Sequence, residues 1–264
     1  MFIKKGDNTT VYGEVKPRVK CKSCNRQQFE ADTIKLDPPS QKFTPDVVKR
    51  GKRFVITSVQ NNTDTNHEFL KALESYCTRN FAELLIIPLT YEGNEYDDLD
   101  WDCDSKYLVN DTFSLNGMIT VLGDMNIVAT AQNPISTLET LSKGTSLIVP
   151  HNQLQLKSLP VTGKAQSVVL CSTGTISTKN YPQNKTGRKA LFNHSNSAIL
   201  IDFESDMYHM RVLNADSQNG FFDIDGYYIG DEFAPLTHVS ALITGDEHVL
   251  VSCLLYTSPS FDNW

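Results

Sequence analysis

The residues best suited to metal chemistry lie near the end of the sequence. An apolar run, residues 241–244, is followed by Gly245, Asp246, Glu247 and His248. A carboxylate and an imidazole two residues apart project to the same side of an extended chain, and both side chains bind divalent metals. We therefore expect Asp246 and His248 to hold one Mn²⁺ or Zn²⁺ ion. The alternative is a last core strand that ends in a surface histidine.

This spacing resembles the first metal block of calcineurin-like metallophosphoesterases, which reads strand-Asp-x-His. The resemblance implies a two-metal centre that activates a water on a phosphoester, completed in that family by later Asp, Asn-His and His blocks. Only Asp246 and His248 carry the match here, so we expect little or no hydrolysis by this chain alone. Asp124 after a second apolar run, with Asn193 and His194, offers a permuted version of the same blocks.

A second candidate metal site lies near the beginning of the sequence. Cys21 and Cys24 form a C-x-x-C pair, and two thiolates at this spacing can hold one tetrahedral zinc ion. A structural zinc needs four ligands, and the sequence has no second C-x-x-C or H-x-x-x-H to supply the others. A surface loop with two reduced thiols is the alternative.

A polar and basic segment, from Thr173 to His194, lies between two strand-like runs. It contains Lys179, Lys185, Arg188, Lys189 and His194, in contrast to the acidic balance of the chain as a whole. We expect these five side chains to contact phosphate. The alternative is a long hairpin loop with ordinary surface lysines.

The stretch TSVQNNTDTNH, residues 57–67, combines the end of a predicted strand with the start of a predicted helix. Ligands collect at such crevices because free helix N–H groups and polar side chains converge there. The sequence has neither G-x-G-x-x-G nor G-x-x-x-x-G-K-[ST], so we predict no nucleotide cofactor. The alternative is that Asn62, Thr63 or Asp64 only caps the helix.

The elements that position these residues follow from the apolar periodicity. Residues 53–60 and 82–91 read as buried strands, and residues 66–81 between them have helical spacing, which predicts a β-α-β unit with parallel strands. From residue 118 to 251 strand-like runs dominate, and only residues 134–144 look helical. The predicted fold class is α/β or α+β, strand-rich, with a mixed sheet.

Composition and spacing also suggest domain boundaries. Residues 1–50 are polar and irregular, and we expect an N-terminal arm or C-x-x-C module and a linker there. Residues 51–252 form the mixed α/β domain, and residues 253–264 read as a non-native or disordered tail.

The chain has 264 residues, 40% of them hydrophobic, and a net charge of −7. This charge argues against coating nucleic acid by bulk electrostatics but allows a local basic surface.

Several segments together resemble a group of uncharacterised proteins of tailed bacteriophages, among them residues 52–77, AELLIIPLTY, IVPHNQLQLKSLP and STGTISTKNY. The resemblance implies a viral protein in the cytoplasm of an infected bacterium. The sequence has no run of about 18 apolar residues, so we predict no membrane span. We therefore expect an accessory region of a metal-dependent phosphoesterase or nuclease, with nucleic acid as a partner. The alternative is a non-enzymatic binding or structural module that forms homo-oligomers.

Overall fold

The computed structural model describes residues 48–90, 101–142, 144–160 and 167–237, together with the backbone of three strands before residue 30. The chain divides into two compact units, Met1–Thr44 and Pro45–Trp264. In the first unit, β1 (Phe2–Thr9), β2 (Val15–Cys21) and β3 (Gln27–Phe29) form an antiparallel sheet. The description of this segment as irregular was wrong, because its many polar residues hide the strand period.

The predicted β-α-β unit is confirmed in the second unit. Strand β5 (Arg53–Gln60) leads into α1 (His67–Asn80), and β6 (Glu83–Leu89) pairs parallel to β5. The hairpin of β12 (Ser197–Glu204) and β13 (Met207–Asn214) adds antiparallel strands, which gives the order β13-β12-β5-β6. The strands of this mixed sheet are rich in β-branched and leucine residues, as expected where both faces of a sheet are covered.

Helix α1 lies within the range predicted from its apolar spacing, but its N-cap is none of Asn62, Thr63 and Asp64. Its N-cap is Asn66, whose side chain accepts a hydrogen bond from the backbone N–H of Phe69 at 3.2 Å. The helix ends at Phe81, which adopts the left-handed conformation at φ 52°. The apolar face of α1, with Phe69, Leu73 and Tyr76 buried, lies against the four-stranded sheet.

A second sheet of six strands has the order β10-β11-β9-β8-β7-β4. Its members are β4 (Val48–Lys49), β7 (Thr112–Leu115), β8 (Ile119–Leu122), β9 (Ser146–Val149), β10 (Leu156–Leu159) and β11 (Val168–Ser172). The central strands β8, β9 and β11 are parallel to one another, and β7 and β10 are antiparallel to their neighbours β8 and β11.

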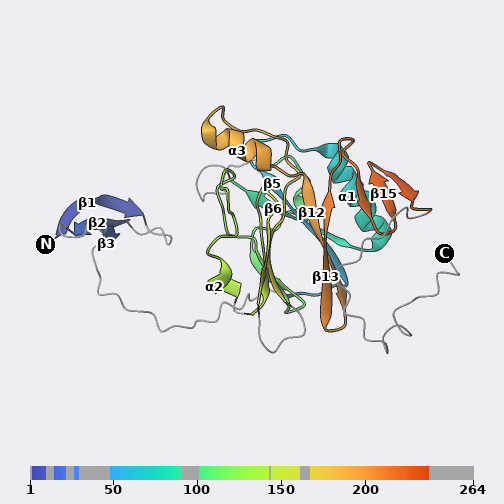
Figure 1. Ribbon diagram of the computed structural model, residues 1–264, viewed down its shortest axis with the longest axis horizontal. Helices are drawn as coiled ribbons and strands as arrows, with labels where there is room; N and C mark the ends of the chain where they lie inside the picture. The colour runs from blue at the N-terminus through green and yellow to red at the C-terminus, as the bar shows by residue number, and fades with distance from the viewer. Residues whose placement is uncertain are drawn as a thin grey trace, which may run out of the picture. The chain divides into compact units, whose positions relative to one another are not determined.

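The two sheets pack face to face, with α1 on the outer face of the four-stranded sheet (Figure 1). The core between them joins Phe54, Ile56 and Ile87 of one sheet to Phe113 and Ile148 of the other. A third cluster, around Leu147 and Leu170, covers the outer face of the six-stranded sheet. These layers bury apolar side chains on both faces of both sheets, and this burial is the main source of stability.

The remaining elements refine the sequence predictions. Residues 220–229, which lie within the stretch of predicted strand-like runs, form a hairpin of β14 (Phe221–Asp223) and β15 (Gly226–Ile229), to which β16 (Glu232–Pro235) adds a third strand. The helix expected over residues 134–144 is the short α2 (Glu139–Ser142). The segment read as a loop contains α3 (Lys185–Asn193), and a short 3-10 helix, η1, spans Ser105–Tyr107. Within the described ranges, no helix has the length and apolar character to cross a membrane.

Candidate functional site

The segment after β11 crosses from the six-stranded sheet to the carboxyl end of β5. Its hydroxyl and carbonyl groups bond to Ser58: the Thr175 hydroxyl donates to the Ser58 carbonyl at 2.9 Å, and the Ser58 hydroxyl donates to the Gly174 carbonyl at 2.7 Å. Gly174 has φ +70°, and a Cβ there would lie 1.8 Å from the Ser197 hydroxyl oxygen. Only glycine fits this crossing, because both the conformation and the space exclude a side chain.

A hydrogen-bonded network of buried polar side chains fills the same edge. The Asn152 side-chain amide N–H groups donate to Gln60 Oε1 at 2.5 Å and to the Tyr181 hydroxyl at 3.0 Å. The Tyr181 hydroxyl contacts His194 Nδ1 at 2.7 Å, and His194 Nε2 contacts the Ser177 carbonyl at 3.1 Å. We call Gln60, Asn152, Tyr181 and His194 the edge network. Gln60 belongs to residues 57–67, where the sequence predicted a ligand crevice, and that crevice stays a prediction.

The edge network fixes the protonation state of His194. A carbonyl can only accept, so Nε2 of His194 carries the proton, Nδ1 is the acceptor, and the Tyr181 hydroxyl donates to it. Burial, with a smaller contribution from the charge of Lys179, lowers the pKa of His194 to about 4, although the hydrogen bond to Ser177 acts in the opposite direction. His194 is therefore neutral at pH 7, with both ring nitrogens bonded inside the protein. A phosphate contact by His194 stays a prediction, and it would require the ring to break one of these bonds.

Two residues of the edge network flank α3 and hold its ends. Tyr181 precedes the helix and His194 follows it as the C-cap, so their bond ties both ends to the sheet edge. The helix starts at Asn184, whose side chain accepts from the Gly187 N–H at 2.7 Å. A Cβ on Gly187 would lie 2.0 Å from the Pro182 carbonyl oxygen, so glycine lets the first turn pack on the preceding loop. The basic segment therefore contains a helix that is held at both ends, and it is not a long loop.

The outer side of α3 carries a concentrated positive charge. Lys185, Arg188 and Lys189 are exposed, and none of them takes part in the ion pairs found between described residues. We call these three residues the basic face of α3. The sequence contains no acidic residue between Glu139 and Asp202, although the whole chain is acidic. Lys179 is exposed too, in the loop before the helix.

The predicted metal ligands do not meet in the described structure. Asp246, His248 and Cys24 lie outside the described residues, as does the side chain of Cys21 at the end of β2, so both metal sites stay predictions. Within the ranges that the structure describes, no three His, Cys, Asp or Glu side chains gather as they would around a metal ion. Two residues of the permuted arrangement have other partners, because Asp124 accepts a hydrogen bond from the Thr112 hydroxyl and His194 belongs to the edge network; the arrangement itself stays a prediction.

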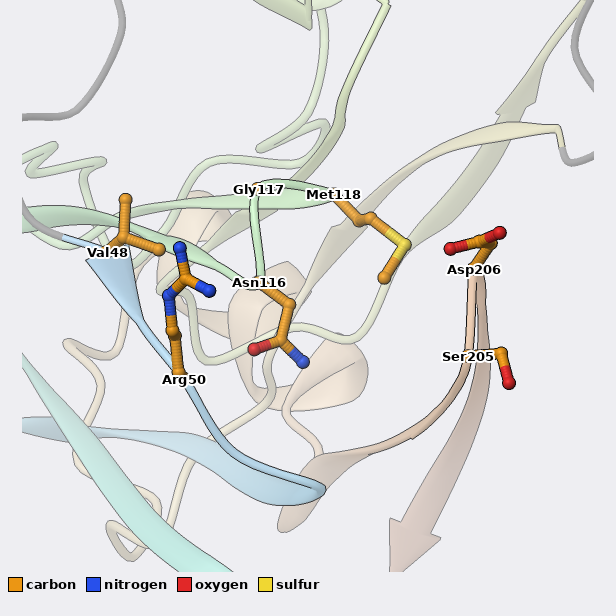
Figure 2. A pocket seen from close by; sticks show the side chains of 7 residues that line it. All are labelled: Val48, Arg50, Asn116, Gly117, Met118, Ser205 and Asp206. Atoms are coloured by element: carbon orange, nitrogen blue, oxygen red, sulfur yellow. The ribbon is translucent and has the colours of Figure 1, made fainter.

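A separate hollow of about 540 Å³ lies at the opposite end of β5. Figure 2 shows Arg50 and Asp206 on its two sides, with Asn116, Gly117 and Met118 of the β7–β8 turn between them. The Asn116 side chain accepts a hydrogen bond from the Gly51 N–H and donates one to the Gly51 carbonyl, so it connects this turn to the chain before β5. In Figure 1 the β12–β13 turn, which carries Asp206, lies at the lower end of the sheets and α3 at the upper end.

Comparison with known proteins links the chain to a bacteriophage. It is similar to Protein A1 of Escherichia phage T5. The two sequences are 32% identical over an alignment of 197 residues, and the match covers 67% of this chain and 34% of the phage protein. The chain thus spans about a third of the length of this relative, and the predicted resemblance to phage proteins is confirmed. No family model and no solved structure matches the chain.

Sequence reasoning found the charged residues of α3 and His194 but missed Asn152, which joins the α3 segment to β5. Asn152 is 1% exposed and joins Gln60 of β5 to Tyr181 of the α3 segment. One signal was available: the run PHNQ directly follows the buried strand β9, as polar residues at a sheet edge often do.

Proposed function

We propose that this chain is part of a phage protein that acts in nucleic-acid processing, and that the described domain is an accessory region that binds nucleic acid through the basic face of α3. The supporting observation is the set of exposed cations on a helix that the edge network holds at both ends. Clusters of lysine and arginine bind phosphate backbones. A helix that is already held rigidly loses less conformational entropy on binding.

The chemistry of the edge network supports a binding role for this region. Its four side chains are amides, a phenol and a neutral imidazole, which are bonded to one another. Phosphoester hydrolysis by two metals needs several anionic or imidazole ligands around an open position. The described side chains do not fit such a centre, so a metal-dependent step by this chain would depend on Asp246 and His248.

Nucleic-acid binding is tested with the full chain and a triple variant, Lys185→Ala, Arg188→Ala and Lys189→Ala. Fluorescence anisotropy measures the affinity for labelled single-stranded and duplex DNA at several salt concentrations. We expect the triple variant to bind at least about tenfold more weakly at low salt. The slope of log affinity against log salt should become shallower by about 0.7 for each single-strand phosphate contact removed.

A matched control removes the same charge elsewhere: Lys52→Ala, Lys71→Ala and Lys106→Ala, all exposed residues outside the α3 segment. This control should keep the affinity within about twofold. Equal losses in the two triple variants would show that α3 is not the binding surface, and no DNA binding by the wild-type chain would refute the proposed function.

The metal-dependent part of the proposal has its own test. Manganese binding by the full chain, measured by isothermal titration calorimetry, should disappear in Asp246→Ala if Asp246 and His248 form the first metal block. Zinc bound at one equivalent and lost in Cys21→Ser would instead identify the N-terminal C-x-x-C pair.

A further inference from the structure

Phe192 stands out on the surface of α3. Its side chain is 89% exposed, in the last turn of a helix that is fixed at both ends. Its ring forms none of the aromatic or cation-π contacts between described residues. Leaving a phenylalanine in water forgoes the stabilisation that burial would give, so the exposed ring has a cost in the free chain.

The position of the Phe192 ring relative to the three cations indicates which kind of ligand would cover the ring. A helix turns about 100° per residue, so the basic face and Phe192 fall within an arc of about 100°. Gly187 and Ala190, on the opposite side of the helix, are buried. One aromatic ring therefore lies among three cations on the same exposed surface, with no acidic residue nearby in sequence.

We propose that this surface binds single-stranded nucleic acid, with one unpaired base stacked on Phe192 and the adjacent phosphates on the basic face of α3. The inference rests on the proposed function and adds the strand state of the ligand. Every base has a π-face that stacks on an exposed aromatic ring, but in a duplex the neighbouring base pairs occupy both faces. Cations beside the ring bind the backbone of the same strand.

Two other occupants fit the surface less well. A membrane surface needs a broad apolar face that enters the lipid boundary, and α3 exposes only Phe192 and, in part, Leu191. A protein partner covers about 800 Å² on each side of a standard interface, far more than one aromatic ring on a nine-residue helix provides. Charge and a single flat ring together favour a nucleic-acid strand.

The test separates stacking from charge. Phe192→Leu removes the ring and keeps an apolar side chain, whereas Phe192→Trp keeps a ring and adds a fluorophore. The probes are a thymidine oligonucleotide, an abasic oligonucleotide with the same number of phosphates, and a duplex of equal length. The control is Phe81→Leu, because Phe81 is 92% exposed at the end of α1 and lies outside the α3 segment.

We expect the wild-type chain to bind the thymidine strand about tenfold more tightly than the abasic strand, the size of effect that one stacked base gives. Phe192→Leu should lose this preference and bind the abasic strand as the wild type does. Phe192→Trp should keep it, with tryptophan fluorescence quenched on binding, and Phe81→Leu should behave as the wild type.

Three results would overturn the inference. Equal binding of thymidine and abasic strands by a chain that does bind DNA would reject stacking while leaving the proposed function in place. Binding to phosphatidylglycerol vesicles that depends on Phe192, with no preference between the DNA probes, would assign the surface to lipid. A wild-type chain that binds no DNA would refute both this inference and the function on which it rests.

Discussion

The edge network makes stability depend on pH through His194. The unfolded chain binds a proton on this imidazole with a pKa of 6.5, whereas burial and the charge of Lys179 lower the folded pKa to about 4. Protonation therefore favours the unfolded chain. The stability that neutral His194 provides is complete above about pH 6.5 and is lost as the pH falls from 6.5 towards 4.

The size of this effect follows from the two pKa values. At pH 5 most unfolded chains are protonated at this position and few folded chains are, which costs about 2 kcal/mol of unfolding free energy relative to pH 7. The variant His194→Gln lacks the titrating group. We expect it to be less stable than the wild type at pH 7, by about 1 kcal/mol for the hydrogen bonds it loses. At pH 5 the wild type should lose about 2 kcal/mol more than the variant does.

Urea unfolding followed by circular dichroism at pH 7 and pH 5 gives both free energies. Other titrating groups cancel in the comparison of variant with wild type, as long as they act independently. His209→Gln is the control for the substitution itself: His209 is exposed on β13, so this change should cost less than about 0.5 kcal/mol at pH 7. A stability difference between wild type and His194→Gln that is the same at both pH values would refute a buried, neutral His194.

Three further predictions concern the scaffold. In urea unfolding, Gly174→Ala should destabilise the fold by about 1–3 kcal/mol more than Gly117→Ala. Both glycines have positive φ, but only a Cβ on Gly174 would meet other atoms. Equal effects of the two substitutions would contradict the close packing at Gly174. Burial would raise the pKa of Asp223, but hydrogen bonds from Arg211 and Tyr76 hold it below its usual range. Asp223→Asn should therefore cost about 3 kcal/mol by the same measurement, against less than about 0.5 kcal/mol for the exposed Asp206→Asn, and a cost within that small range would contradict the paired carboxylate. Burial raises the pKa values of Cys77 and Cys171 to about 12, so iodoacetamide at pH 8 should modify them only after unfolding, as mass spectrometry of digested peptides can show; labelling of the folded chain would disprove their burial.

The sequence predicted those features of the fold that neighbouring residues determine, and it missed those that depend on tertiary contacts. The β5-α1-β6 unit was predictable because one contiguous stretch carries two apolar runs and a helical period, and adjacent strands joined by a helix pair in parallel. The N-cap was placed two or more residues too early, because several polar residues in residues 61–66 can cap and tertiary contacts decide among them. Asn66 was selected because its backbone N–H also donates to the Ile176 carbonyl, at 2.7 Å.

The candidate site shows the other side of this division. Its cations were found from charge alone, but their arrangement on a helix was not, because Pro182, Asn184 and Gly187 are residues typical of loops. The packing of Gly187 on Pro182 and the bond from Tyr181 to His194 make that segment a helix. Phe192 and Leu191 looked like ordinary apolar residues, and only the orientation of α3 exposes them.

By itself the sequence determined the strand-rich class, the parallel unit and the basic character of one segment, since each follows from the order of neighbouring residues. Tertiary structure alone decided that Gln60, Asn152, Tyr181 and His194 meet at one edge. These residues come from separate elements, and no local pattern encodes a hydrogen bond between residues 92 positions apart in the chain. They are joined because two sheets pack face to face and bring the ends of their strands together, and buried polar groups must then bond to one another.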